Sequence, residues 1–189
     1  DAYNVAVGFS AGNAVTTGTK NTIIGSSAGD ALTDADFNTA VGFGSLGFDQ
    51  LGSKTTAIGY RALGTQRFTT AADSFNTAVG YDAGLEVTTG DANTLIGGLA
   101  GDAITTGAKN VALGKNSLGA NTAGNKAVAI GTDALATQNI TSDGDSFNVA
   151  VGYQAGTAVT TGQFNTLIGG LSGDALTTGA QNVAIGYSA

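Results

Sequence analysis

Two segments of the chain carry the Gly-x-Ser-x-Gly pattern in which serine hydrolases hold their nucleophile, at residues 8–12 and 25–29. A serine nucleophile needs a base to accept its proton, and in a Ser-His-Asp triad that base is histidine. The 189 residues include no His, so this triad cannot form, and they include no Cys for thiolate chemistry. Because the pattern also returns at a regular interval, we interpret it as part of a repeat and expect no enzymatic activity.

Aspartates are the other residues that could do chemistry. Asp30, Asp102 and Asp174 are 72 residues apart, and close pairs occur at Asp34 and Asp36 and at residues 143 and 145. Calcium requires several oxygen ligands that converge within about 2.5 Å. Repeat-related aspartates in a stacked β-structure would be separated by about 19 Å, four spacings of ~4.8 Å. We therefore predict solvated turns at these positions, with an ion site as the alternative, and expect no cofactor.

The elements that position these side chains follow a glycine period. A short motif of the type Asn-Thr-Ala-Val-Gly recurs, and three spacings of 17 residues followed by one of 21 give a longer repeat of 72. Residues 75–114 and 147–186 are identical at 30 of 40 positions without a gap. Such periodicity indicates a solenoid with one coil per short repeat. The marker glycines are Gly8, Gly25, Gly42, Gly59, Gly80, Gly97, Gly114, Gly131, Gly152, Gly169 and Gly186.

Each short repeat is too rich in glycine for a helix and contains two short β-prone stretches, Val5–Val7 and Ala14–Thr17 in the first repeat. Strands of this length are stable only when the next coil pairs with them. The sequence therefore predicts an all-β fold, a parallel β-roll of about eleven 17-residue coils. We treat residues 1–189 as one domain and a fragment of a longer fibre, with 72-residue super-repeats at 4–75 and 76–147 and a partial one at 148–189.

Two aliphatic ladders run through the predicted strands. The residue before each marker glycine is β-branched or leucine, and the residue before that is alanine, leucine or isoleucine. Adjacent strand residues point to opposite faces, so both faces are predicted to be buried. Because a roll has one interior, we expect the second face to meet other copies, with the small ladder between the chains of a homotrimer. The predicted trimer and core packing residues are Ala78, Val79, Leu95, Ile96, Ala112, Leu113, Ala150, Val151, Leu167 and Ile168.

Asparagine begins the predicted strand in nine of eleven coils, for example at Asn76 and Asn93. We interpret this ladder as structural, because stacked amides bond to one another or to turn backbone. Four extra residues in every fourth coil predict surface loops at 67–74 and 139–146. These loops and the aromatic residues that recur in phase are the candidate receptor contacts: Arg67, Phe68, Asp73, Asn139, Asp143, Asp145, Tyr81 and Tyr153.

The charge of the chain limits the classes of partner that it can bind. The formal net charge is −7 and the seven basic residues are scattered, whereas nucleic-acid binding needs a basic stripe. No apolar run approaches the roughly 20 residues of a membrane span. We therefore expect no nucleic-acid partner and no membrane insertion by this segment.

The pattern Asn-Thr-Ala-Val-Gly-Tyr-x-Ala-Gly…Thr-Thr-Gly-x-x-Asn-Thr, seen in residues 76–94, resembles the repeats of bacteriophage tail-fibre proteins, including those of cyanophages. It is also similar to the head repeats of trimeric autotransporter adhesins. The resemblance covers essentially the whole chain. It implies a left-handed parallel β-roll that trimerises and binds a cell-surface receptor or glycan. The implied location is a virion tail fibre or an extracellular cell surface, and the 17-residue coil favours the phage fibre.

Two other functions remain open at this point. A monomeric solenoid could bind ice or glycan through a flat face, because Thr-Thr pairs recur in phase, although adjacent threonines point to opposite faces. A glycan-degrading tailspike would need paired carboxylates at a groove, and no acidic pair follows the coil phase.

Overall fold

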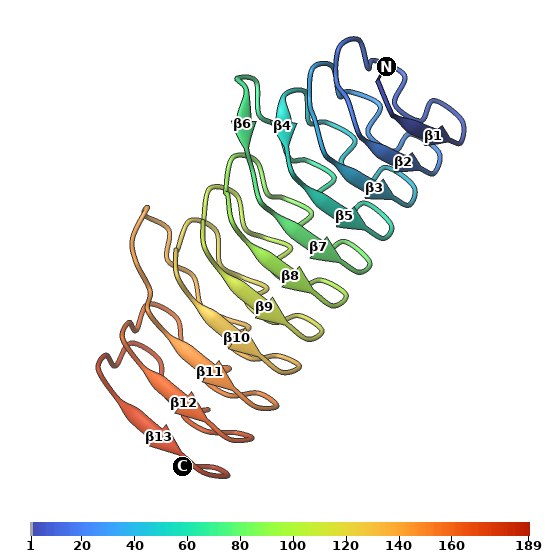
Figure 1. Ribbon diagram of the computed structural model, residues 1–189. Helices are drawn as coiled ribbons and strands as arrows, with labels where there is room; N and C mark the ends of the chain where they lie inside the picture. Colours follow the sequence, from blue (N-terminus) through green and yellow to red (C-terminus); the bar gives the residue numbers. More distant parts are fainter. Residues whose placement is uncertain (1) are drawn as a thin grey trace.

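The computed structural model describes residues 2–189, and Asp1, the first residue of the predicted domain, lies outside the described residues. The described residues form a parallel β-solenoid in which each coil contributes one strand to a long sheet (Figure 1). This sheet has eleven strands in the order β1-β2-β3-β5-β7-β8-β9-β10-β11-β12-β13, all parallel. The predicted all-β fold and its coil period are confirmed.

The strands are short and recur in phase. Within the long sheet, equivalent residues of neighbouring coils are paired directly, such as Ala78 with Leu95. A second, two-stranded parallel sheet joins β4 to β6 at the longer coil of the first super-repeat. The strands are β1 (Val5–Val7), β2 (Thr22–Ile24), β3 (Thr39–Val41), β4 (Gly52–Ser53), β5 (Thr56–Ile58), β6 (Ala72–Asp73), β7 (Thr77–Val79), β8 (Thr94–Ile96), β9 (Val111–Leu113), β10 (Val128–Ile130), β11 (Val149–Val151), β12 (Thr166–Ile168) and β13 (Val183–Ile185).

The marker glycine ends each strand of the long sheet because the chain turns there against the next coil. Gly97 has a φ of 134°, a conformation that side-chain-bearing residues rarely adopt. A Cβ atom at Gly97 would lie 2.6 Å from the carbonyl carbon and oxygen of Gly114. The column of marker glycines is therefore the line along which neighbouring coils approach most closely without side chains.

The second predicted strand, Ala14–Thr17, is wrong, because the chain bends there. Thr16 and Gly18 both donate their backbone N–H to the carbonyl of Thr33, at 3.0 and 3.2 Å. Because two N–H groups of one coil share a single carbonyl acceptor, the backbone curls around that carbonyl. It therefore cannot continue a β-ladder. The coils remain bonded to one another in this region without forming a strand.

The small aliphatic ladder lines the interior of the solenoid, which corrects the prediction that it lies between chains. Ala78, Leu95, Ala112, Ala150 and Leu167 are all fully buried within the single chain. The interior is narrow, so a large strand residue there faces glycine: a Cβ atom at Gly101 would lie 2.7 Å from Cδ2 of Leu95. Residues sealed inside the roll cannot contact a second chain.

The larger aliphatic ladder is on the outer face of the sheet. Val79, Ile96 and Val151 are half-buried, while Leu113 is 43% and Ile168 39% exposed. Because alternate strand residues face opposite ways, burial of the middle residue of each strand forces these side chains outward. The two predicted ladders are therefore present, and within the single chain the small one faces the interior while the larger one faces outward.

The asparagine ladder holds neighbouring coils together, as predicted. Nδ2 of Asn93 donates to the carbonyl of Gly107 at 2.9 Å, and Oδ1 of Asn93 accepts the N–H of Asn110 at 3.0 Å. The N–H of Asn93 in turn donates to Oδ1 of Asn76 at 2.8 Å. Each buried amide is thus bonded both to a turn of its own coil and to the next coil, and the structural interpretation is confirmed.

Two coils of the first super-repeat carry polar residues where other coils place an interior aliphatic side chain. Nε2 of Gln66 donates to Oδ2 of Asp49 at 2.6 Å and to Oγ1 of Thr55 at 3.2 Å. Oε1 of Gln66 accepts Nδ2 of Asn76 at 2.9 Å. All four residues are buried, so this network satisfies polar groups that water cannot reach.

The equivalent network in the second super-repeat is incomplete. Gln138 takes the place of Gln66, and its Oε1 accepts Nδ2 of Asn148 at 2.7 Å. Its Nε2 is buried and has no hydrogen-bond partner among the described residues. Ala127 stands where the first super-repeat has Thr55, and Asn121 stands where it has Asp49, so the hydroxyl and the carboxylate that accept this amide in the first network are both absent.

Replacing Ala127 with threonine is expected to raise the stability of the rod. The new hydroxyl would accept the buried Nε2 of Gln138, and an unsatisfied buried donor costs about 1–3 kcal/mol. We expect Ala127→Thr to gain about 1 kcal/mol, measured by urea unfolding followed by circular dichroism. Thr55→Ala should lower stability, because Oγ1 of Thr55 accepts Nε2 of Gln66 and is hydrogen-bonded to Oγ of Ser74, although Gln66 keeps its bond to Asp49. An unaltered midpoint for Ala127→Thr would contradict the assignment.

Candidate functional site

The predicted receptor contacts lie in two separate regions of the solenoid. The loops 67–74 and 139–146 are longer excursions, and β4 and β6 place the first of them at the edge opposite the turns that follow the arrowheads (Figure 1). Tyr81 and Tyr153 belong to those turns, because each comes two residues after the end of a strand of the long sheet. The structure therefore does not bring the eight candidates into one site.

In the longer loops, most candidate side chains hold the loop in place. Asp73 is exposed and forms an ion pair with Lys54, while Asp145 pairs with Lys126 at 2.6 Å. Oδ1 of Asn139 accepts the hydroxyl of Thr122 at 2.9 Å. These contacts are repeated in both super-repeats or join neighbouring coils, which is the behaviour of a structural loop.

The remaining loop candidates are more varied. Oδ1 of Asp143 accepts Nδ2 of Asn125 at 2.8 Å, and Asp143 and Asp145 border a polar depression of about 370 Å³ that also includes Lys109. Arg67 is exposed and Phe68 half-buried. Three carboxylates and two ammonium groups line this depression, so its charges are mixed and largely offset one another.

The aromatic candidates differ between the super-repeats. Tyr81 and Tyr153 are each 57% exposed. Tyr81 stacks on Tyr60 with ring centroids 5.3 Å apart, and Tyr60 stacks on Phe43 at 5.5 Å. Two rings of this stack, Phe43 and Tyr60, belong to the first super-repeat and the third, Tyr81, to the first coil of the second. The stack lies beside a concave surface.

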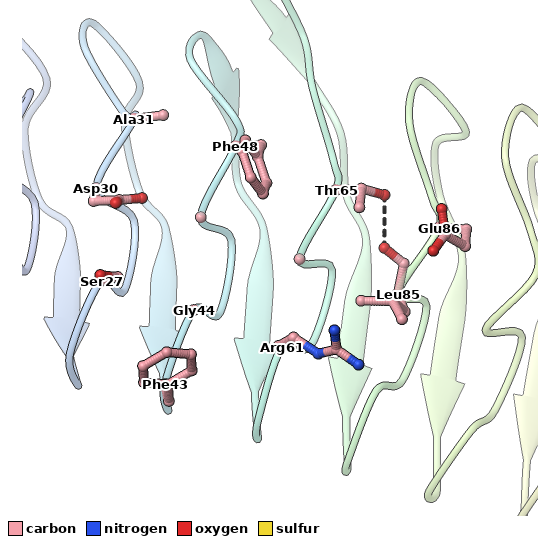
Figure 2. A pocket seen from close by; sticks show the side chains of 12 residues that line it. Ser27, Asp30, Ala31, Phe43, Gly44, Phe48, Arg61, Thr65, Leu85 and Glu86 are labelled. Atoms are coloured by element: carbon pink, nitrogen blue, oxygen red, sulfur yellow. Dashed lines mark hydrogen bonds between the residues drawn. The ribbon is translucent and has the colours of Figure 1, made fainter.

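A groove of about 490 Å³ crosses the second to fifth coils, residues 21–92, beside the stack. Figure 2 shows Phe43 and Arg61 on one side of it, Phe48 on the other, and Asp30 and Glu86 toward its two ends. Phe43 is 52% and Phe48 64% exposed. The groove is thus an apolar channel with carboxylates near both ends.

Arg61 is the cation that lines the groove, and its charge is already matched. Nε and Nη2 of Arg61 donate to the two carboxylate oxygens of Asp82, at 3.0 and 2.8 Å, and form a bidentate ion pair. The hydrogen bond to Asp82 raises the pKa of Arg61 above its usual value. With this pair neutralised, Asp30 and Glu86 dominate the electrostatics of the groove.

Sequence reasoning missed this groove, although the chain carries a signal for it. The residues 72 positions after Phe43, Phe48 and Arg61 are Lys115, Ala120 and Asp133. Most strand and turn positions keep their residue type between the super-repeats, whereas these three change from aromatic or cationic to unrelated types. A comparison of the super-repeats for positions that differ, in place of those that agree, would have identified them.

Asp102 is the most perturbed carboxylate that the structure describes. Burial raises the pKa of its carboxyl, and the nearby charges of Asp82 and Glu86 raise it further. Its Oδ1 atom is buried and lacks a hydrogen-bond partner among the described residues. The charged form of Asp102 is therefore disfavoured in the folded chain.

Asp102→Asn is expected to stabilise the rod at neutral pH and to have no such effect in acid. Below the ordinary pKa of aspartate the wild-type carboxyl is protonated in both folded and unfolded chains; as pH rises through the raised folded pKa, the wild type loses stability. The gain is small after solvent screening, about 1 °C in Tm. Thermal melts between about pH 3 and pH 7 test this, with the exposed Asp174→Asn as the matched control.

The threonine pairs do not form a free flat array. Thr88 Oγ1 donates to the carbonyl of Thr105 at 3.1 Å, and Thr105 Oγ1 donates to that of Thr122 at 3.1 Å. In four of the five pairs the first threonine thus donates its hydroxyl to the next coil, while the second, such as Thr89 or Thr106, is exposed. These four hydroxyls have no proton left to donate to ice or another surface.

Within residues 2–189, no group of three or more His, Cys, Asp or Glu side chains is placed to hold a metal ion. No helix in the same range is long and apolar enough to span a membrane. The chain matches no protein-family model, and comparisons with curated proteins and with solved structures found no match either. Function is therefore inferred from the surfaces described above.

Proposed function

We propose that this chain is a rod-like segment of a homotrimeric fibre that attaches to a cell surface, of the kind found in phage tail fibres. The observation that carries the proposal is the uncovered apolar face of the long sheet. Parallel sheets are normally covered on both faces, and here only the inner face is. Even in the middle of the rod, Ile58 is 37% and Leu113 43% exposed.

The outer face is chemically uniform along the whole rod. Its two outward positions in each strand are threonine, valine, isoleucine or leucine in every coil, without a charged residue. An apolar surface of this extent on a soluble protein marks a contact with another macromolecule. A partner that matches the face must repeat at the coil spacing, and another copy of the same chain has that spacing.

The number of chains and the winding come from the resemblance. Tail-fibre and adhesin repeats of this pattern imply three chains and a left-handed roll, and we include both in the proposal. A rigid rod of eleven coils at ~4.8 Å would extend for about 50 Å, a suitable spacer that displays receptor contacts. The proposed location is a virion tail fibre or an extracellular surface.

Light scattering on a sizing column tests the proposal directly. A trimer has three times the chain mass of 18.4 kDa, and this result is expected. A folded monomer would overturn the trimeric fibre and favour a flat-face binder. Binding of the trimer to candidate host cells, followed with a fluorescent label, then tests attachment itself.

A further inference from the structure

The groove across the second to fifth coils has a floor of backbone. Gly44, Gly47 and Gly64 line it and contribute no side chain. A Cβ atom at Gly47 would lie 3.5 Å from Oδ1 of Asp30, so the Asp30 carboxylate sits directly beside this floor. A ligand in the groove can therefore approach peptide groups and a carboxylate at the same time.

The walls combine flat apolar rings with hydrogen-bond acceptors. Phe43 and Phe48 expose ring surface from the third coil, and Asp30 and Glu86 supply carboxylates from the second and fifth coils. The side-chain hydroxyl of Thr65 already donates to the carbonyl of Leu85 at 2.6 Å, so it is free to accept (Figure 2). Acceptors near both ends and rings between them suit a ligand with many hydroxyl donors and apolar C–H faces.

We propose that this groove binds a short neutral oligosaccharide. The C–H faces of sugar rings would pack on Phe43 and Phe48, and sugar hydroxyls would donate to Asp30 and Glu86. The two carboxylates are three coils apart, roughly 14 Å at the coil spacing. One sugar residue is about as long as one coil is thick, so a trisaccharide spans the groove.

The charges of the groove disfavour acidic ligands and purely apolar ligands. An acidic ligand would meet Asp30 and Glu86, while the one cation in the wall, Arg61, already donates to Asp82 through Nε and Nη2. A purely apolar ligand would strip water from the two carboxylates without offering them a donor, which is costly. A neutral ligand rich in hydroxyls avoids both penalties.

The residues 72 positions further along the chain provide an internal comparison. At the equivalent positions Lys115 replaces Phe43, Ala120 replaces Phe48, and Ala158 replaces Glu86. Both rings and one carboxylate are absent there, while Asp102 retains the place of Asp30. The site is thus confined to one level of the rod, where a local function would be placed on a repetitive scaffold.

This inference deepens the proposed attachment function and rests on it, because a cell surface is where such a glycan would be met. Saturation-transfer NMR with maltotriose, cellotriose and chitotriose as probes tests it on the intact chain. At least one neutral probe is expected to bind the wild type with millimolar affinity or better. The acidic probe trigalacturonate is expected to bind more weakly than any neutral probe that binds.

The decisive variant gives the groove the residues of the second super-repeat. Phe43→Lys with Phe48→Ala removes both rings, and we expect binding to weaken about tenfold or more. Lys115→Ala, the matched exposed position outside the groove, should bind as the wild type does. Circular dichroism confirms that each variant remains folded.

Three results would overturn the oligosaccharide site: no neutral probe binds, the double variant binds as tightly as the wild type, or trigalacturonate binds best. Light scattering of the same samples separates this failure from failure of the fibre. A trimer without a sugar signal removes the groove proposal alone. A monomer that binds a neutral probe keeps the groove and removes the fibre.

Discussion

Replacing Val79 with aspartate is expected to convert the proposed trimer into folded monomers. The Val79 side chain is on the outer face of β7, so in a single chain the new carboxylate would reach water. In a trimer the same change would place three like charges in an apolar contact, at a cost of several kcal/mol. Light scattering should fall from three chain masses to 18.4 kDa, with an unchanged circular dichroism spectrum.

The neighbouring residue is the matched control. Ala78 is fully buried inside the roll, and Ala78→Asp would bury an unpaired charge whatever the number of chains. We expect this variant to lose about 3–5 kcal/mol of stability and to unfold locally. A soluble, folded trimer of the Val79→Asp variant would show that the outer face does not join the chains.

The second large effect is expected at a marker glycine. Gly97→Ala would place a methyl group 2.6 Å from the backbone carbonyl of Gly114, at a φ of 134° that alanine avoids. Neither atom can move without separating two coils. We expect a loss of about 4 kcal/mol and a fall of roughly 10 °C in Tm.

The adjacent glycine makes this prediction specific. A Cβ atom at Gly98 would have one neighbour within 4 Å, the carbonyl oxygen of Tyr81 at 3.9 Å. Gly98→Ala should therefore leave the melting temperature within about 2 °C of the wild type. Equal losses for the two variants would mean that the close approach of neighbouring coils is not what requires glycine at position 97.

The sequence predicted the elements that repeat, because repetition itself reports which positions neighbouring coils share. The strand before each marker glycine and the ladder of asparagines such as Asn93 follow from side chains that recur every 17 residues. The sequence did not predict which aliphatic ladder faces the interior and which faces outward. Ala78 and Val79 are both apolar, and the period cannot tell which of them the narrow interior accepts.

The second strand and the groove failed for different physical reasons. Residues 14–17 have strand-like composition, but flanking glycines let Thr16 and Gly18 curl around one carbonyl. The groove depends on residues from four coils and on a floor of glycine backbone, so no local motif announces it. Phe48 and Arg61 line the same groove as Asp30 only because the solenoid stacks their coils.

The residues that the super-repeats share at their boundaries have a consequence for the length of the molecule. Phe147, Asn148 and Ser146 repeat the residues Phe75, Asn76 and Ser74 at the end of each longer coil. Excision of residues 76–147 would join Phe75 to Asn148 and keep every ladder in phase. The chain can thus be shortened or extended in steps of 72 residues, each of which changes the length of the rod by about 19 Å.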